Sequence, residues 1–377
     1  MKYNFDCINP QLEAETRRQA SINRLVDRKL SYQEFDNAFV LPSKDLWKDG
    51  KCPGGVVTAD GVFVESSAWH EGNRCCAYDF DTSLCRADSR TVIYMGFYNP
   101  CWGHAITDNL KKLWFLDTEE GHQMLDEGAV PIYITISNLP MPKYIHRLFQ
   151  LAGVSLADFE HVTELTRFSR IIVPDNSFIA DRGQRYFTSQ YVDIIERIKQ
   201  NVSPTVQPTG KIYFTRTGIK STRERGESDI EKVFQKKGYK IISPEKESVD
   251  EQIRLLAGCD AFAATEGSVS HNAVFCPAHT PVTIIRKCND VNKYQMAVNE
   301  VADVDVTYVD AHCSIMTPKD SPWVGPFYLC VNRNLERWAG HHIFHLNRRL
   351  RPSWWAYLNQ QKRWYNRLQR VLGKIKL

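Results

Sequence analysis

The sequence predicts an α/β fold of two Rossmann-like halves that face each other across a cleft. Beyond position 211, short apolar segments of strand length alternate with helical patterns, as in parallel sheets with helical crossovers. A stretch with two prolines, one glycine and no charged residue (NVSPTVQPTG, 201–210) separates the two parts. The length of 377 residues suits two cores better than one.

The second half has the more regular pattern. There we expect strands at 211–215, 239–242, 260–264 and 281–285, and helices at 228–237, 248–257 and 269–275. In the first half we expect a hairpin at 54–65 that turns at Asp60-Gly61, strands at 91–96, 131–136 and 170–173, and helices at 103–116, 143–151 and 184–200. The predicted domains are therefore 1–200 and 211–330, joined by the linker 201–210 and followed by helices in 331–377.

The composition is that of a globular protein. The first residues contain no apolar signal-peptide core, and no run approaches the roughly 18 apolar residues that span a bilayer. The 11 cysteines are irregularly spaced, include no CxxC pair, and suit free thiols in a reducing compartment. We therefore expect a cytoplasmic location and no structural zinc.

The basic charge is concentrated at the end of the chain. Residues 348–377 contain nine Lys or Arg and no acid, which leaves 39 basic against 44 acidic residues elsewhere. In 351–377 an apolar face with Trp354 and Trp355 lies opposite these cations. This basic amphipathic helix fits an anionic membrane surface or a terminal helix docked on the partner domain; nucleic-acid binding is disfavoured by the acidic body.

A loop rich in cations follows the strand at 211–215. It carries Arg216, Lys220, Arg223 and Arg225 before the next helix. Guanidinium groups at the carboxyl end of a strand suit a phosphate or diphosphate. The alternative is a solvated loop whose arginines pair with acidic neighbours.

A second loop at the same predicted edge contains Glu266-Gly267-Ser268. Gly267 permits close backbone approach, the following helical amides could bind an anion, and Ser268 and Ser270 add hydroxyl groups. The alternative is a plain helix cap. His271 and Asn272 belong either to the cleft or to the core.

His104 and Asp108 are spaced i, i+4 and so share one helix face. A histidine oriented by a carboxylate is a plausible general base. The alternative is that His104 caps the helix and Asp108 pairs with Lys112. Asp79-Phe80-Asp81 resembles a metal-binding carboxylate pair, but we interpret it as a turn and infer no metal.

These segments together resemble the family 61 glycosyltransferases, which are linked to capsular polysaccharide synthesis in bacteria. Four motifs in order carry the resemblance over roughly residues 90–290. They are Asn99, Trp102, Gly103, His104 and Asp108; Tyr213-Phe214-Thr215-Arg216 followed by Arg223 or Arg225; the helix Glu251–Leu255; and the turn Glu266-Gly267-Ser268-Val269-Ser270-His271-Asn272. Glu266 departs from the family, which often has His at that position.

The resemblance implies a GT-B fold, a nucleotide-sugar donor such as a UDP sugar, inversion at the anomeric carbon, and no obligatory metal or other cofactor. It implies that 1–200 is the acceptor side and 211–330 the nucleotide side. Arg216, Arg223 or Arg225 and residues 266–270 would bind the diphosphate, and His104 or Asp108 would be the base. Asn99, Trp102, Gly103, His271 and Asn272 are further cleft candidates. The expected acceptor is a glycan, free or lipid-linked.

Two other interpretations remain at this point. A polysaccharide pyruvyl transferase would use the same arginines for an enolpyruvate donor. A noncatalytic scaffold would dock on membranes through 351–377 and bind no nucleotide.

Overall fold

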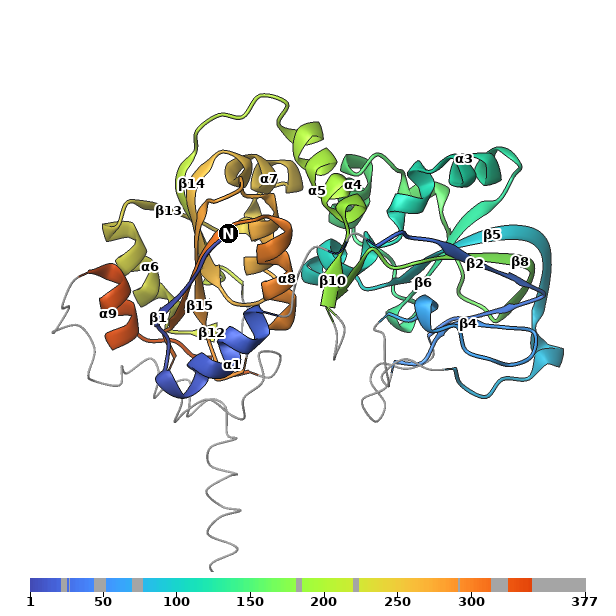
Figure 1. Cartoon of the computed structure of the whole chain (residues 1–377), viewed down its shortest axis with the longest axis horizontal. Coiled ribbons are helices and arrows are strands. Elements are labelled where there is room, and N and C mark those ends of the chain that lie inside the picture. Colours follow the sequence, from blue (N-terminus) through green and yellow to red (C-terminus); the bar gives the residue numbers. More distant parts are fainter. Residues whose placement is uncertain are drawn as a thin grey trace, which may run out of the picture.

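The structure is a computed structural model, and it describes residues 1–21, 26, 28–43, 52–69, 77–180, 185–219, 224–290, 292–312 and 325–340. Two α/β halves lie side by side, each built on its own sheet (Figure 1). Helices α4 (Lys143–Leu151) and α5 (Ser189–Val202) of the first half contact α7 (Val249–Ala257) of the second. A mixed α/β architecture with parallel strands is therefore confirmed, and it is compatible with a Rossmann-like glycosyltransferase fold.

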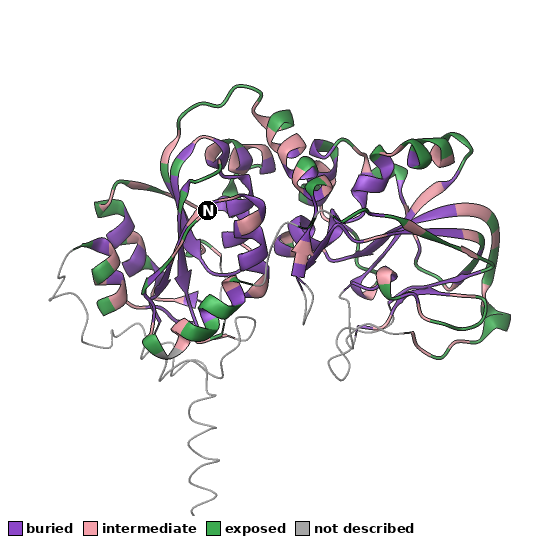
Figure 2. Cartoon of the chain, viewed as in Figure 1, coloured by how far each residue is buried: buried purple, intermediate pink, exposed green. Residues whose placement is uncertain are grey.

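The second half is a parallel sheet. Among the described residues it has six strands in the order β1-β16-β15-β14-β11-β13. Their bounds are β1 Tyr3–Cys7, β11 Gly210–Phe214, β13 Tyr239–Ile242, β14 Cys259–Thr265, β15 Pro281–Arg286 and β16 Asp305–Asp310. The central strand β14 is apolar along most of its length because helices cover both faces of the sheet (Figure 2).

Residues 3–20 lie with this second sheet, although we expected them in the first domain. β1 pairs in parallel with β16, and Tyr3 is in register with Val306. Helix α1 (Pro10–Ala20) contacts α8 (Lys293–Val301). In the loop between β1 and α1, the amide of Asn9 donates to Asp310 Oδ2 at 2.6 Å. A parallel pair between such distant segments leaves no local sequence signal, which is why the assignment failed.

The first half is a mixed sheet of seven strands within the described residues, in the order β4-β3-β8-β5-β6-β7, with β2 also paired to β8. Their bounds are β2 Tyr32–Asp36, β3 Phe39–Leu41, β4 Gly55–Val57, β5 Arg86–Tyr98, β6 Val130–Thr135, β7 Glu160–His161 and β8 Thr166–Pro174. The expected turn at Asp60-Gly61 is present, since Val57 bridges Phe63 in antiparallel fashion.

Shorter elements complete the two halves. They are the strand pairs β9 (Phe178–Ala180) with β10 (Arg185–Phe187) and β12 (Glu224–Arg225) with β17 (Phe327–Tyr328), and the helices α2 (Trp102–His104), α3 (Glu119–Asp126), α6 (Glu227–Lys236) and α9 (Arg333–Ala339). Helix α9 contacts β1 and β16, so it packs on the second half. The basic segment 351–377 lies outside the described residues.

The expected helix at 103–116 is broken into three unlike turns. After α2, residues Ala105–Asn109 form a π-helical turn, and Leu113–Asp117 form a 3₁₀ helix. Tyr191 of α5 donates its hydroxyl to the carbonyl of Ile106 within the π turn. π turns are frequent at functional sites because they redirect side chains at the cost of regular hydrogen bonding.

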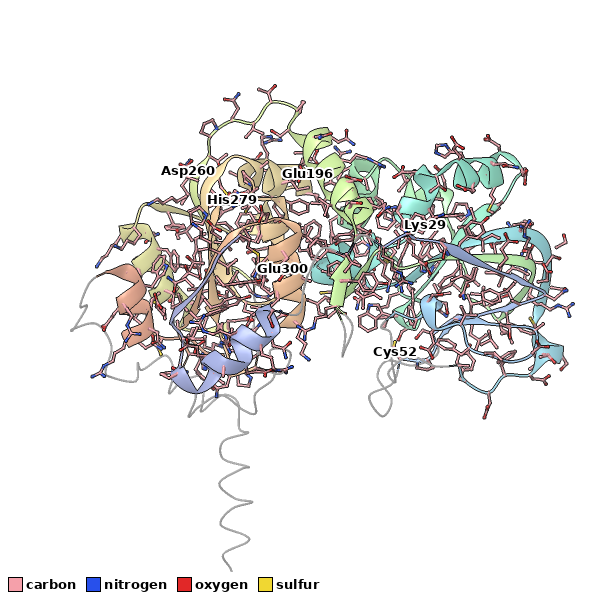
Figure 3. The ribbon with its side chains drawn as sticks, viewed as in Figure 1. Lys29, Cys52, Glu196, Asp260, His279 and Glu300 are labelled. Carbon is pink, nitrogen blue, oxygen red and sulfur yellow. The ribbon has the colours of Figure 1, made fainter. Side chains whose placement is uncertain are left out.

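One apolar core crosses the junction of the halves. Ile93, Tyr98 and Leu148 of the first half belong to the same cluster of buried side chains as Phe262 and Ile284 of the second. Figure 3 labels Glu196 on α5 near this junction, with Glu300 on the side of the second half and Lys29 on the side of the first. The two halves are therefore packed together through shared apolar contacts.

No helix in the described ranges is both long enough and apolar enough to cross a membrane.

Two ion pairs of the fold should differ strongly in their contribution to stability. Arg286 and Asp310 lie 3.3 Å apart and are fully buried, whereas Arg147 and Asp250 form a bidentate pair that is partly exposed between the halves. We expect Asp310→Ala to lower the free energy of unfolding by about 3–5 kcal/mol, because it leaves Arg286 buried without its counter-charge. Arg147→Ala should cost about 0.2–1 kcal/mol. Urea unfolding measures both, and equal losses would contradict this assignment.

Candidate active site

Charged side chains gather at one edge of the second sheet. Arg216 follows β11, Glu266 follows β14, Lys287 follows β15, and Asp310 ends β16. These four strands are parallel, so their carboxyl ends meet at the same edge. In open α/β sheets this is the edge where ligands bind.

A cavity of about 770 Å³ lies between this edge and the first half. Ligand pockets in proteins commonly have this size. The lining residues are Trp102, Lys143, Tyr144 and Arg147 from the first half, and Arg216, Ile219, Pro244, Glu245, Glu247, Ser248, Val249, Asp250, Gln252, Ser268, Val269 and Asn272 from the second. The structure thus brings five of the predicted residues to one cavity: Trp102, Arg216, Ser268, Val269 and Asn272.

Gly103 lies in close contact with the second half. A Cβ atom on Gly103 would lie 2.8 Å from Ser268 Oγ, 3.0 Å from His271 Nδ1 and 3.2 Å from Ser268 Cα. A larger residue there would displace the Ser268 side chain and push the Ser268 backbone by a few tenths of an ångström. Beside this contact, Trp102 Nε1 donates to Asn272 Oδ1 at 3.1 Å. The segment that carries His104 therefore lies directly on the turn that follows β14.

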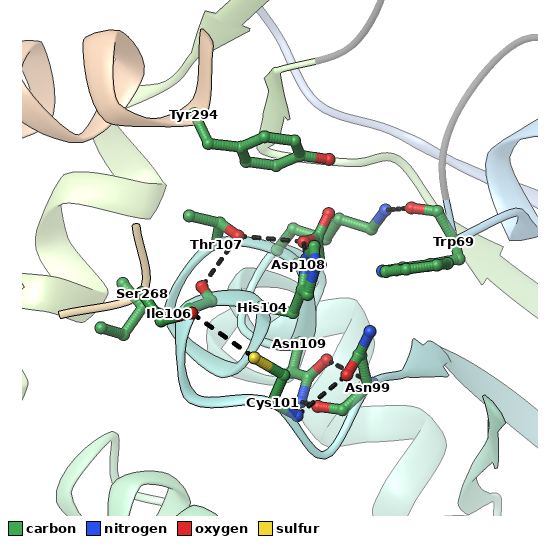
Figure 4. Close-up of polar contacts among 12 residues, drawn as sticks. Trp69, Asn99, Cys101, His104, Ile106, Thr107, Asp108, Asn109, Ser268 and Tyr294 are labelled. Atoms are coloured by element: carbon green, nitrogen blue, oxygen red, sulfur yellow. Dashed lines mark hydrogen bonds and ion pairs between the residues drawn. The ribbon is translucent and has the colours of Figure 1, made fainter. Parts of the chain in front are cut away.

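His104 and Asp108 form a hydrogen-bonded pair (Figure 4). His104 Nδ1 lies 2.7 Å from Asp108 Oδ2, and the Thr107 hydroxyl donates to the same oxygen at 2.9 Å. A carboxylate that accepts from Nδ1–H leaves the lone pair of the imidazole on Nε2. The His104 side chain is 22% exposed and that of Asp108 only 5%. The predicted i, i+4 pairing is present, while Lys112 donates to the carbonyl of Pro174.

Two aromatic rings from different halves flank the His104 imidazole. Trp69 meets it edge-on at 4.8 Å between ring centroids, and Tyr294 of α8 does so at 5.8 Å (Figure 4). Below the imidazole, Asn99 and Asn109 exchange hydrogen bonds between side chain and backbone, which fixes the loop between them. Asn99 is thus placed as a support of this loop, outside the cavity lining.

Hydrogen bonds among its own residues stabilise the turn at Gly267. The Ser270 hydroxyl accepts from the Gly267 amide at 3.0 Å and lies within hydrogen-bond distance of the Gly267 carbonyl and of Gln295. Residues Ser270–Phe275 form a buried 3₁₀ helix instead of the expected α-helix. The Ser270 hydroxyl and the Gly267 amide therefore stabilise the turn, and Ser268 and Val269 are its members that reach the cavity.

Glu224 lies between two cations at the sheet edge. Its Oε2 is 3.4 Å from Arg216 Nε, and its Oε1 accepts from Lys287 Nζ at 2.8 Å. Lys287 also lies 3.3 Å from the position that a Cβ of Gly267 would occupy. Arg225, in the short ladder with β17, donates to the carbonyl of Glu224 and is not part of the cavity lining. Arg223 lies outside the described residues.

Lys287 and the cations of α4 were missed by the sequence analysis. Lys287 lies two positions after the end of the predicted strand 281–285. Its place at the ligand edge could therefore have been predicted from the sequence. Lys143 and Arg147 had no such signal, because their approach to the cavity depends on how the halves pack.

Burial perturbs several ionisable groups near this edge. Burial raises the pKa of Glu266 to about 7, against the attraction of Arg286 and Lys287. It likewise raises the pKa of Glu227 to about 7, although Thr265 and Tyr213 donate hydrogen bonds to this carboxyl group. Glu266 is fully buried and is not part of the cavity lining.

Among the described residues, no group of three or more His, Cys, Asp or Glu is arranged to hold a metal ion. Asp81 caps a short 3₁₀ helix by accepting from the Ser83 amide at 2.8 Å, which agrees with the turn expected there. Metal independence itself stays a prediction.

His271 should make folding sensitive to acid. Burial, and secondarily the nearby His104, lower the pKa of His271 from 6.5 to about 3. Between these values the unfolded chain takes up a proton that the folded protein does not, so stability falls as the pH drops from about 6.5 toward 3. We expect His271→Asn to remove about 2 kcal/mol of the loss between pH 7 and pH 5. Urea unfolding at both pH values tests this; parallel pH profiles for the two proteins would contradict it.

Comparison with known proteins bears on the same residues. No curated protein matches the chain. Residues 102–283 match the family model Glycosyltransferase 61, and this stretch begins at Trp102 and includes His104, Asp108, Arg216 and the turn at Gly267. The matched domain agrees with the resemblance drawn from the four motifs, and it identifies the protein as a glycosyltransferase enzyme.

Proposed function

We propose that the protein is an inverting, metal-independent transferase with a GT-B arrangement. It would move a sugar from a UDP sugar to a hydroxyl group of a glycan acceptor during the synthesis of a cell-surface polysaccharide. One observation carries the proposal: Arg216 and Ser268 line a cavity between the halves, and Gly103, next to the His104–Asp108 pair, lies against the turn that contains Ser268.

The leaving diphosphate needs positive charge. Arg216 lines the cavity, and Lys287 lies behind the Gly267 turn on the far side of Glu224. We propose that the diphosphate binds at Arg216. In the structure Arg216 pairs with Glu224, and the bound diphosphate would replace Glu224 as its counter-charge. Positive groups fixed where negative charge develops stabilise the transition state without a reorganisation cost.

The acceptor hydroxyl needs a base on the opposite side. Asp108 is buried and already accepts from His104 and Thr107, so His104 is the better candidate. In the proposed step, His104 Nε2 takes the hydroxyl proton while the acceptor oxygen bonds to the anomeric carbon. The bond from that carbon to the diphosphate breaks, UDP leaves with its electron pair, and Asp108 stabilises the imidazolium that forms.

Nucleotide binding tests the donor site. Arg216→Ala should weaken UDP binding at least tenfold, because a charge-assisted contact is worth about 1.5–3 kcal/mol. Arg170→Ala is the matched control: this arginine pairs with Glu34 on the first sheet, outside the cavity lining, so its loss should leave the Kd within twofold. Isothermal titration with UDP and, separately, phosphoenolpyruvate gives both values. Binding of phosphoenolpyruvate alone, or wild-type affinity of Arg216→Ala for UDP, would refute the proposal.

Turnover tests the base. We expect His104→Gln and Asp108→Asn to lower kcat by about 10²–10⁴-fold, since both remove or misorient the general base. Their Kd for UDP should remain within twofold of the wild type. The assay follows UDP release from the UDP sugar that the wild type consumes fastest, with His146→Gln on α4 as the control. Near wild-type turnover in both variants would show that this pair is not the base.

A further inference from the structure

A second cavity, of about 470 Å³, lies within the first half and away from the interdomain cavity. It is formed between β2, the turn after β4, and the segment that follows β8. Its walls include Gln33 and Phe35, which project from the same face of β2, and the side chains of Phe63, Glu65, Ser66 and Tyr186.

The chemistry of this cavity differs from that of the interdomain cavity. Phe35 and Phe63 are partly exposed, and an amide, hydroxyl groups and carboxylates surround them. Among the described residues that line the cavity, the one cation is Arg28, which lies 3.8 Å from Asp175 and stacks on Tyr186. The described lining therefore offers a phosphate a single cation, and that cation already faces a carboxylate.

Such a lining suits an uncharged ring with many hydroxyl groups. Aromatic side chains offer apolar surface to the C–H face of a sugar, while amides and carboxylates bond its hydroxyls. A volume of about 470 Å³ also falls within the usual range for small-molecule sites. The cavity thus favours a neutral sugar over a nucleotide.

Two walls of the cavity are connected to the segment of the His104–Asp108 pair by short stretches of chain. On one wall, Ser66 is three residues before Trp69, whose ring packs on His104, so the chain spans at most about 11 Å. On the other wall, Asn176 precedes Ser177, whose amide donates to the carbonyl of Lys111 at 2.9 Å.

Lys111 joins these two walls. It lies three residues after Asp108, and its Nζ donates to the carbonyl of Trp69 at 2.9 Å. Trp69 and Lys111 therefore connect the walls of this cavity to the segment that carries the proposed base.

We propose that this cavity is an acceptor subsite, which binds a neutral sugar unit of the glycan adjoining the unit that reacts. The inference rests on the proposed function, because it takes His104 as the place of reaction. It assigns Gln33, Phe35, Phe63 and Ser66 to recognition of the acceptor glycan.

The test measures binding of neutral tetrasaccharides by saturation-transfer NMR and titration, in the presence of UDP. The probes are linear gluco-, galacto-, manno- and xylo-tetrasaccharides. We expect at least one to bind the wild type, Gln33→Ala to weaken it at least fivefold, and Ser66→Trp, which fills the cavity, to abolish binding. Gln190→Ala is the control, because it removes the same side chain from a separate cavity beside Trp114.

The outcomes separate the two proposals. If no neutral tetrasaccharide binds, or if Ser66→Trp binds one as tightly as the wild type does, the subsite is refuted. UDP affinity of each variant, measured in the same samples, should stay within twofold of the wild type. A wild type that binds a tetrasaccharide in a Ser66-dependent manner but binds no UDP would refute the donor site and keep the glycan subsite.

Discussion

The absence of a side chain at Gly103 is the constraint on which the rest of the site depends. With no Cβ at this position, the turn that carries Trp102 and His104 lies directly against Ser268 and His271 of the other half. The contact places a proposed base from one sheet beside the ligand edge of a second sheet. Trp102 and Asn272 add a directional hydrogen bond, and the shared apolar core supplies the buried surface that packs the halves together. A transferase needs two reactants within reach of each other, and this junction fixes where they can meet.

The charges around the second sheet form an arrangement that is balanced without a ligand. Glu224 contacts both Arg216 and Lys287, while Glu266 lies near Arg286 and Lys287. Buried cations are costly when unpaired, so the carboxylates keep them in place until another anion arrives. The described lining of the first-half cavity has no such group of cations. This contrast in charge is what the proposed pairing of a charged donor with a neutral acceptor requires.

Local elements could be predicted from sequence wherever packing follows a local pattern. Helix α4 and strand β13 have the expected bounds, since an amphipathic face and a short apolar run mark them clearly. Non-local features could not be predicted: the pairing of β1 with β16, the π turn supported by Tyr191, and the place of Lys143 and Arg147. Within the site, the spacing of His104 and Asp108 was informative. The sequence did not indicate that the Ser270 hydroxyl stabilises its own turn, because its partner Gln295 comes from another element.

The pairing of β1 with β16 also has a consequence for how the chain is made. β1 is synthesised before every other strand of its sheet, and its partner β16 is completed roughly 300 residues later. At about 5–20 residues per second, this delay is on the order of 15–60 s. During translation the first half can collapse on its own sheet, since its strands β2 to β8 are contiguous in the chain. The segment that contains β1, in contrast, has no partner strand during that interval. Its backbone hydrogen-bonding groups are then open to pairing with other polypeptides.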